Sequence, residues 1–152
     1  MSELRDLYQE IILDHGKSPR NFRKVEASPH QAKGYNPLCG DSVQVFLTID
    51  KAGLIADAAF QGRGCAISIA SASLMTEAIK GKTVPQAQAL FDEFRHLVTE
   101  ADDHGHSHDD LGPLVALGGV RQYPSRVKCA TLAWHTMVSA AAGEVTSPVT
   151  TE

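Results

Sequence analysis

Two neighbouring segments of the chain alternate between apolar and mostly polar residues. Residues 43–49 and residues 54–60 both follow this period of two, and a short turn at residues 50–53 separates them. Such alternation predicts a β-hairpin with one buried face. Because hairpin strands run antiparallel, the start of the first strand lies beside the end of the second. The residues that flank the hairpin are therefore expected at the same end of the sheet.

Helical periodicity characterises most of the remaining chain. A short strand at residues 30–35 is also expected, in an otherwise extended segment that is rich in proline. Thr83 and Gln86 have the spacing of a capping box at a helix start. The apolar spacing, the caps and the glycine stops predict helices over residues 2–14, 66–80, 83–98, 111–117 and 124–142.

Length and composition favour one domain over residues 1–142, followed by a flexible tail at residues 143–152. The chain has 152 residues, of which 43% are hydrophobic, and this suffices for one sizeable core. The net charge of −4 argues against a nucleic-acid surface. No apolar run reaches the roughly 20 residues of a membrane span, and the start lacks the apolar region of a signal peptide. A cytoplasmic location is therefore expected.

Three cysteines and one aspartate are the chemically distinctive residues. Cys39 and Asp41 flank a glycine in a loop, whereas Cys65 and Cys129 fall at the starts of predicted helices. The positive helix N-terminus favours a thiolate over a thiol. Cys129 lies off the apolar stripe of its helix, in the first turn, so it need not be buried in the core. An odd number of thiols in a reducing compartment suits metal or sulfur chemistry better than disulfides.

The spacing of the cysteines leaves their role open. A single free cysteine is usually a small buried hydrophobic residue, and the chain has no CxxC pair of the zinc-finger kind. Any metal site would have to be assembled by tertiary folding. Three cations, Arg63, Arg126 and Lys128, lie within three residues of a cysteine and are predicted to support such a site. Ordinary solvated side chains are the alternative for each of them.

Alternating histidines at positions 104, 106 and 108 form a second candidate for metal capture. Glycine, serine and several aspartates surround them. This composition favours a mobile, solvated loop over a metal site.

Three segments resemble the signature stretches of the IscU/NifU-N-like iron–sulfur cluster assembly proteins. They are NPLCGD at residues 36–41, GRGCAIS at residues 62–68 and RVKCA at residues 126–130. The resemblance extends over nearly the whole chain. It implies an α+β fold in which a small antiparallel sheet of about three strands packs against several helices. It also implies that Cys39, Asp41, Cys65 and Cys129 converge on one metal site.

Two departures from the scaffold pattern point to the SufU branch of this family. Lys128 replaces the histidine that precedes the third cysteine of IscU-type scaffolds, and protonated lysine cannot bind a metal. The stretch between Cys65 and Cys129 is also longer by roughly twenty residues, enough for an added element. This resemblance implies zinc as cofactor and sulfur transfer from a SufS-type cysteine desulfurase to Cys39. Asp41, Cys65 and Cys129 would then hold the metal. The implied partners are the desulfurase and downstream proteins that accept sulfur or clusters.

Two other functions remain compatible with the same residues. The chain could be an assembly scaffold that binds iron and a nascent iron–sulfur cluster on the same cysteines. Alternatively, a purely structural zinc could shape a partner-binding module. Asp41 argues against that last reading, because closed structural zinc sites usually use sulfur and nitrogen donors.

Overall fold

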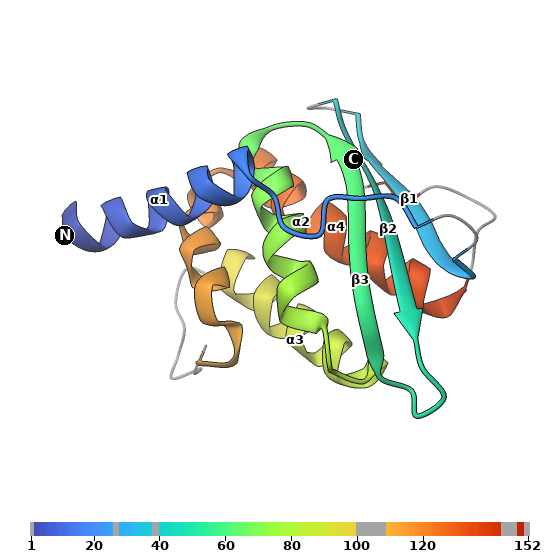
Figure 1. Ribbon diagram of the computed structural model, residues 1–152. Helices are drawn as coiled ribbons and strands as arrows, with labels where there is room; N and C mark the ends of the chain where they lie inside the picture. Colours follow the sequence, from blue (N-terminus) through green and yellow to red (C-terminus); the bar gives the residue numbers. More distant parts are fainter. Residues whose placement is uncertain (1, 26–27, 38–39, 100–108, 144–148, 151–152) are drawn as a thin grey trace.

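A single sheet with strand order β3-β2-β1-β4 forms one layer of the molecule (Figure 1). The computed structural model describes residues 2–25, 28–37, 40–99, 109–143 and 149–150. The strands are β1 (His30–Asn36), β2 (Asp41–Ile49), β3 (Ile55–Arg63) and β4 (Val149–Thr150). The first three are antiparallel, which confirms the predicted hairpin and the short strand before it. The two-residue β4, from the predicted tail, pairs parallel with β1.

The strand register brings three chain segments together at one end of the sheet. Asn36, the last residue of β1, is paired with Asp41, the first residue of β2. Ser42 is paired with Arg63, the last residue of β3. Cys65 therefore follows β3 at the end where β2 begins, as the hairpin pattern predicted.

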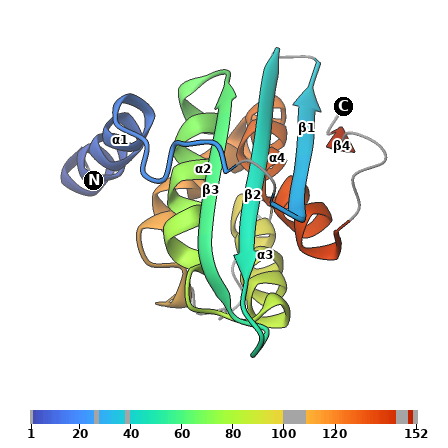
Figure 2. The same cartoon turned by 45° about the vertical axis from the view of Figure 1, so that its right-hand side comes forward.

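The helices cover one face of the sheet (Figure 2). Apolar side chains of the helices and of the inner sheet face form a continuous core. Within the part of the chain that the structure describes, no helix is long and apolar enough to cross a bilayer. The helices are α1 (Ser2–Lys17), α2 (Ala66–Ile79), α3 (Val84–Thr99), the 3-10 segment η1 (Asp109–Gln122) and α4 (Pro124–Ala142).

Local signals predicted several helix boundaries well. The predicted range of α4 agrees with the structure, and the capping box before α3 is formed. The backbone N–H of Thr83 donates to Gln86 Oε1 over 2.9 Å, and the N–H of Gln86 donates to Thr83 Oγ1 over 3.2 Å. Two orphan donors at the helix start are thereby satisfied.

Two helical segments extend past the glycines that were expected to stop them. α1 continues to Lys17, and Gly16 lies within ordinary van der Waals distance of Ala66 of α2. η1 continues to Gln122, and Gly118 packs against the side chain of Leu97 in α3. In both cases glycine serves helix packing instead of helix termination.

Cys129 is buried in the core, although its place off the apolar stripe did not require this. Its side chain is completely buried, at 0% exposure. α4 packs against β1, β2, α2, α3 and η1, so its middle section is covered on several sides and not only along one apolar stripe. Fully buried Trp134 lies in the same section, stacked on Phe91 and Phe94 of α3.

A buried histidine connects α1 to α2. His15 is 7% exposed, and its Nδ1 lies 2.7 Å from Ser73 Oγ, which also accepts the backbone N–H of Arg20. Glu77 Oε1 lies 3.9 Å from the other ring nitrogen. Burial lowers the pKa of His15 below its ordinary value and the charge of Arg20 adds to this effect, while Glu77 and Asp14 oppose it.

We expect His15→Asn to flatten the pH dependence of the free energy of unfolding between about pH 5 and 7. In the wild type the unfolded chain protonates this histidine first, as the pH falls through its ordinary value of about 6.5. Stability is therefore lost on acidification, until the pH drops below the lowered pKa of the folded state. Denaturant unfolding at several pH values, with both proteins in the same metal state, measures the two slopes. Equal slopes would contradict a lowered pKa of His15 in the folded protein.

Candidate metal centre

Asp41, Cys65 and Cys129 converge at the end of the sheet. One ligand atom from each residue lies within 4.8 Å of the ligand atoms of the other two. The three residues come from different elements: Asp41 begins β2, Cys65 is the N-cap residue of α2, and Cys129 is the sixth residue of α4. The predicted convergence thus holds for these three. Cys39 lies outside the described residues, as do the histidines at positions 104, 106 and 108.

The Asp41 carboxylate is fixed between β2 and the start of α2. It is 1% exposed, and its Oδ1 accepts the backbone N–H of Cys65 over 2.9 Å. The other oxygen, Oδ2, lies 3.9 Å from Cys65 Sγ. Gly64 has a φ of +155° and lies so close that a Cβ atom there would collide with the Asp41 carboxylate. The glycine is therefore required both by its backbone conformation and by the approach of Asp41.

Cys129 is the buried member of the site in α4, and one of its neighbours is a residue with no individually predicted role. Its Sγ is 3.6 Å from the carbonyl oxygen of Ser125, one turn earlier in α4. It is also 3.6 Å from Asn36 Nδ2. The Asn36 side chain is completely buried, and its Oδ1 has no hydrogen-bond partner among the described residues. Only its place in the NPLCGD stretch, next to the loop, pointed to this residue.

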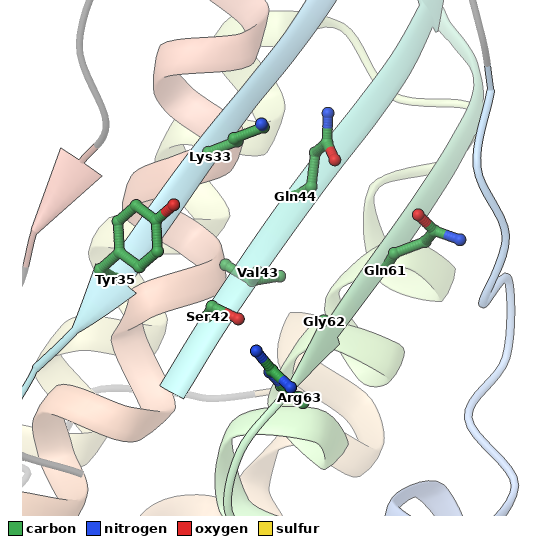
Figure 3. Close-up of a pocket in the computed structure, with 8 residues that line it drawn as sticks. All are labelled: Lys33, Tyr35, Ser42, Val43, Gln44, Gln61, Gly62 and Arg63. Atoms are coloured by element: carbon green, nitrogen blue, oxygen red, sulfur yellow. The ribbon is translucent and has the colours of Figure 1, made fainter. Parts of the chain in front are cut away.

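Of the three predicted supporting cations, Arg126 faces the cysteines. The negative charge of the Cys65 thiolate and a hydrogen bond to it raise the pKa of the Arg126 guanidinium, and Cys129 adds to this effect. Arg126 is otherwise exposed, and Lys128 is half-buried. Figure 3 shows Arg63 beside Ser42, and both line a shallow depression of about 400 Å³ that includes Tyr35. By its pairing with Ser42, Arg63 belongs to the outer sheet face, whereas Asp41 belongs to the inner one.

Residues 7–130 match the family described as the NifU-like N-terminal domain. The chain belongs to this family. The resemblance seen in the three sequence stretches is thereby confirmed, and so is the α+β fold class.

Relatives of this NifU-like chain include a named sulfurtransferase and a named iron–sulfur cluster assembly scaffold. The zinc-dependent sulfurtransferase SufU of Bacillus subtilis (strain 168) is 39% identical over 146 residues, which cover 94% of this chain and 95% of the relative. The iron–sulfur cluster assembly scaffold protein IscU of Streptococcus pyogenes serotype M1 is 36% identical, with 92% of this chain and 86% of the relative covered.

A solved structure supports the same placement of the NifU-like chain. The protein from Fervidobacterium islandicum AW-1, described as a candidate iron–sulfur cluster assembly scaffold for the SUF system, superposes with a TM-score of 0.76. It is 34% identical, and the alignment covers 86% of this chain and 94% of that one. The arrangement of sheet and helices is thus shared with a related protein.

The donor atoms of this NifU-like site suit zinc. Tetrahedral zinc with Zn–S of about 2.3 Å and Zn–O of about 2.0–2.2 Å separates its ligands by roughly 3.5–3.8 Å. The 3.9 Å between Asp41 Oδ2 and Cys65 Sγ is close to this range, and the upper limit of 4.8 Å requires only a small contraction. Thiolate sulfur with one carboxylate is a chemically suitable donor set. Among the described residues the buried Asn36 oxygen has no hydrogen-bond partner, so the site is also polar on this side.

Proposed function

We propose that this protein is a zinc-dependent sulfur acceptor that takes persulfide sulfur from a SufS-type cysteine desulfurase in the cytoplasm. The convergence of Asp41, Cys65 and Cys129 carries this proposal, because it supplies three ligands and leaves the fourth position of a tetrahedral site to another donor. Cys39, only two residues before Asp41, is the remaining cysteine. The relationship to a named zinc-dependent sulfurtransferase supports the same function.

In the proposed transfer, the Cys39 thiolate attacks the outer sulfur of the desulfurase persulfide. A bond forms between Cys39 Sγ and that sulfur, while the persulfide S–S bond breaks. The bonding electron pair leaves with the desulfurase cysteine, which becomes a thiolate. The outer sulfur keeps its proton, so Cys39 becomes a persulfide without net oxidation or reduction.

The charges around the site are compatible with a reaction in which a cysteine acts as a thiolate. When ionised, Asp41, Cys65 and Cys129 place three negative charges within a few ångströms, and the Arg126 guanidinium compensates part of them. Zinc, when bound, keeps cysteine sulfur in the thiolate form and exchanges ligands without redox chemistry. Arg126 is exposed and near the cysteines, so it can also attract an anionic sulfur species to the site.

Cys39→Ala is expected to abolish sulfur acceptance from the desulfurase, because the attacking thiolate is lost. Asp41, Cys65 and Cys129 remain in this variant, so part of the zinc is retained. Cys65→Ala is the companion variant, which we expect to lose both zinc and sulfur transfer. Mass spectrometry of the cysteine peptides locates the added sulfur atom, and metal analysis measures zinc. Normal sulfur acceptance by Cys39→Ala would refute the proposal.

The second candidate is a scaffold on which an iron–sulfur cluster is assembled on the same cysteines. The similarity to proteins named as IscU scaffolds favours it. Two observations separate the candidates. Colourless protein with about one zinc per chain that accepts sulfur supports the first, since zinc is neither redox-active nor coloured. A stable brown cluster that forms under anaerobic reconstitution and passes to an acceptor protein supports the second.

A further inference from the structure

Asn36 is a buried polar residue that contacts the site without belonging to the proposed ligand set. It ends β1 directly opposite Asp41, and both side chains are buried on the inner face of the sheet. At 0% exposure its amide has no access to solvent. A buried amide normally satisfies both of its polar atoms, so a side chain with a partner for only one of them among the described residues needs an explanation.

The amide group of Asn36 is oriented by the sulfur of Cys129. Asn36 Nδ2 donates an N–H toward Cys129 Sγ over 3.6 Å, an ordinary length for a hydrogen bond to the large sulfur atom. The reverse orientation would aim the carbonyl oxygen at the sulfur and repel a thiolate. The observed orientation leaves Oδ1 without a partner among the described residues, and a buried acceptor in that state costs about 1–3 kcal/mol.

A metal-bound thiolate at Cys129 would account for this orientation of the Asn36 amide. An N–H donor withdraws electron density from a thiolate and holds its lone pairs in a fixed direction, as outer hydrogen bonds do for metal ligands in general. Another neighbour of Cys129 Sγ is the Ser125 carbonyl oxygen, which can only accept a hydrogen bond. Arg126 brings a charged donor to this sulfur, whereas Asn36 supplies a neutral side-chain N–H.

We propose that Asn36 is a positioning residue that holds Cys129 as a permanent metal ligand. The amide hydrogen bond directs the thiolate toward the metal and makes it less nucleophilic than a thiolate without such a donor. Cys129 then stays bound while another thiol reacts. This inference rests on the zinc site of the proposed function, and it assigns a role to a residue outside the ligand set.

Asn36→Leu tests the inference, because leucine has a similar volume and no polar atom. Loss of the N–H donor is expected to weaken zinc binding about 10–100-fold in competition with a chelator. In the cobalt(II)-substituted protein, the thiolate-to-metal charge-transfer band is expected to move to longer wavelength, because the sulfur becomes more electron-rich. The metal-free variant should be at least as stable as the wild type, since the partnerless oxygen is removed as well. A merely structural role predicts the opposite: lower stability and an unchanged band.

Two further variants keep the test decisive. Asn36→Asp preserves the shape and places a carboxylate beside the sulfur, so its zinc affinity should fall by at least as much. Asn21→Gly is the matched control, because Asn21 also makes side-chain hydrogen bonds, to Thr76 and Lys80, and its φ of 60° suits glycine. It should lose stability without any spectral shift.

The possible outcomes separate the inference from the proposed function. Two results together, for both Asn36 variants, would overturn the role of Asn36: a zinc affinity within twofold of the wild type, and a cobalt charge-transfer band at the wild-type wavelength. This holds whatever the desulfurase assay gives. A wild-type protein that binds the metals but accepts no sulfur would refute the transfer function and leave the role of Asn36 standing. A wild-type protein that binds neither zinc nor cobalt would overturn both.

Discussion

Gly64→Ala is expected to lower zinc affinity by at least about 100-fold, the upper end of the effect of losing a residue that supports metal ligands. A Cβ atom at this position would overlap the Asp41 carboxylate, whose Oδ1 accepts the N–H of the adjacent Cys65. To relieve the overlap, the carboxylate must move away from Cys65 Sγ, or the start of α2 must move away from β2. Either movement separates two ligands of the proposed site.

The backbone of Gly64 adds a second cost. Its φ of +155° is rarely accessible to residues with a side chain, and forcing alanine into such a conformation costs about 1–3 kcal/mol. Gly81→Ala is the matched control, because Gly81 also has a positive φ, of +83°, but no atom lies within 4 Å of its added Cβ. Both variants should lose stability.

Metal titration of the two glycine variants gives the decisive comparison. Only Gly64→Ala should lose zinc affinity, since only there does the new methyl group collide with a ligand. If both variants bind zinc equally well, the geometry assigned to Asp41 is incorrect.

The elements that the sequence predicted best are those whose signals are local. The hairpin follows from alternation over adjacent residues, and its register requires only a short turn. The capping box at Thr83 and Gln86 is contained within four residues. From the hairpin alone, Cys65 could be placed at the end of the sheet where Asp41 begins β2. That placement accounts for two of the three converging residues.

Burial was harder to predict, because it depends on how many elements cover a helix. The apolar pattern of α4 indicated one buried stripe, yet elements on several sides surround this helix and enclose Cys129. In α2, Ser68, Ser71 and Thr76 are buried although their polarity suggests exposure. Asn36 likewise resembled an ordinary loop residue. Each of these polar side chains is tolerated through tertiary contacts that no short sequence window contains.

Hydrogen bonds between α2 and α4 connect these buried polar side chains to the metal centre. Ser71 Oγ donates to the carbonyl oxygen of Ala130 over 2.5 Å and accepts the indole N–H of Trp134 over 3.2 Å. Ala130 directly follows Cys129, and Ser71 lies less than two turns beyond Cys65. The pair of bonds therefore fixes the distance between the helices that carry the two thiols.

Trp134→Ala is expected to reduce the free energy of unfolding by about 3–5 kcal/mol, the usual cost of truncating a fully buried tryptophan. For a chain of this length, the melting temperature should fall by about 6–20 °C. The cavity would open between α3 and α4, where Phe91 and Phe94 stack on the indole. Trp134→Phe keeps most of the ring contacts but loses the bond to Ser71, so its cost should be about 1–3 kcal/mol. Leu13→Ala, at a residue 54% exposed, should stay within about 0.5 kcal/mol.

Zinc should partly rescue Trp134→Ala, because the metal would join Cys65 on α2 to Cys129 on α4 and so replace part of the lost connection. Binding to the folded state at 100 times the dissociation constant contributes about 2.7 kcal/mol. Calorimetric melting with and without zinc measures this recovery, and chelator competition measures the zinc affinity of the variant. We expect a lower affinity than in the wild type, since the two thiols are held together less firmly. Wild-type affinity in this variant would show that the α2–α4 contact does not determine the position of the thiols.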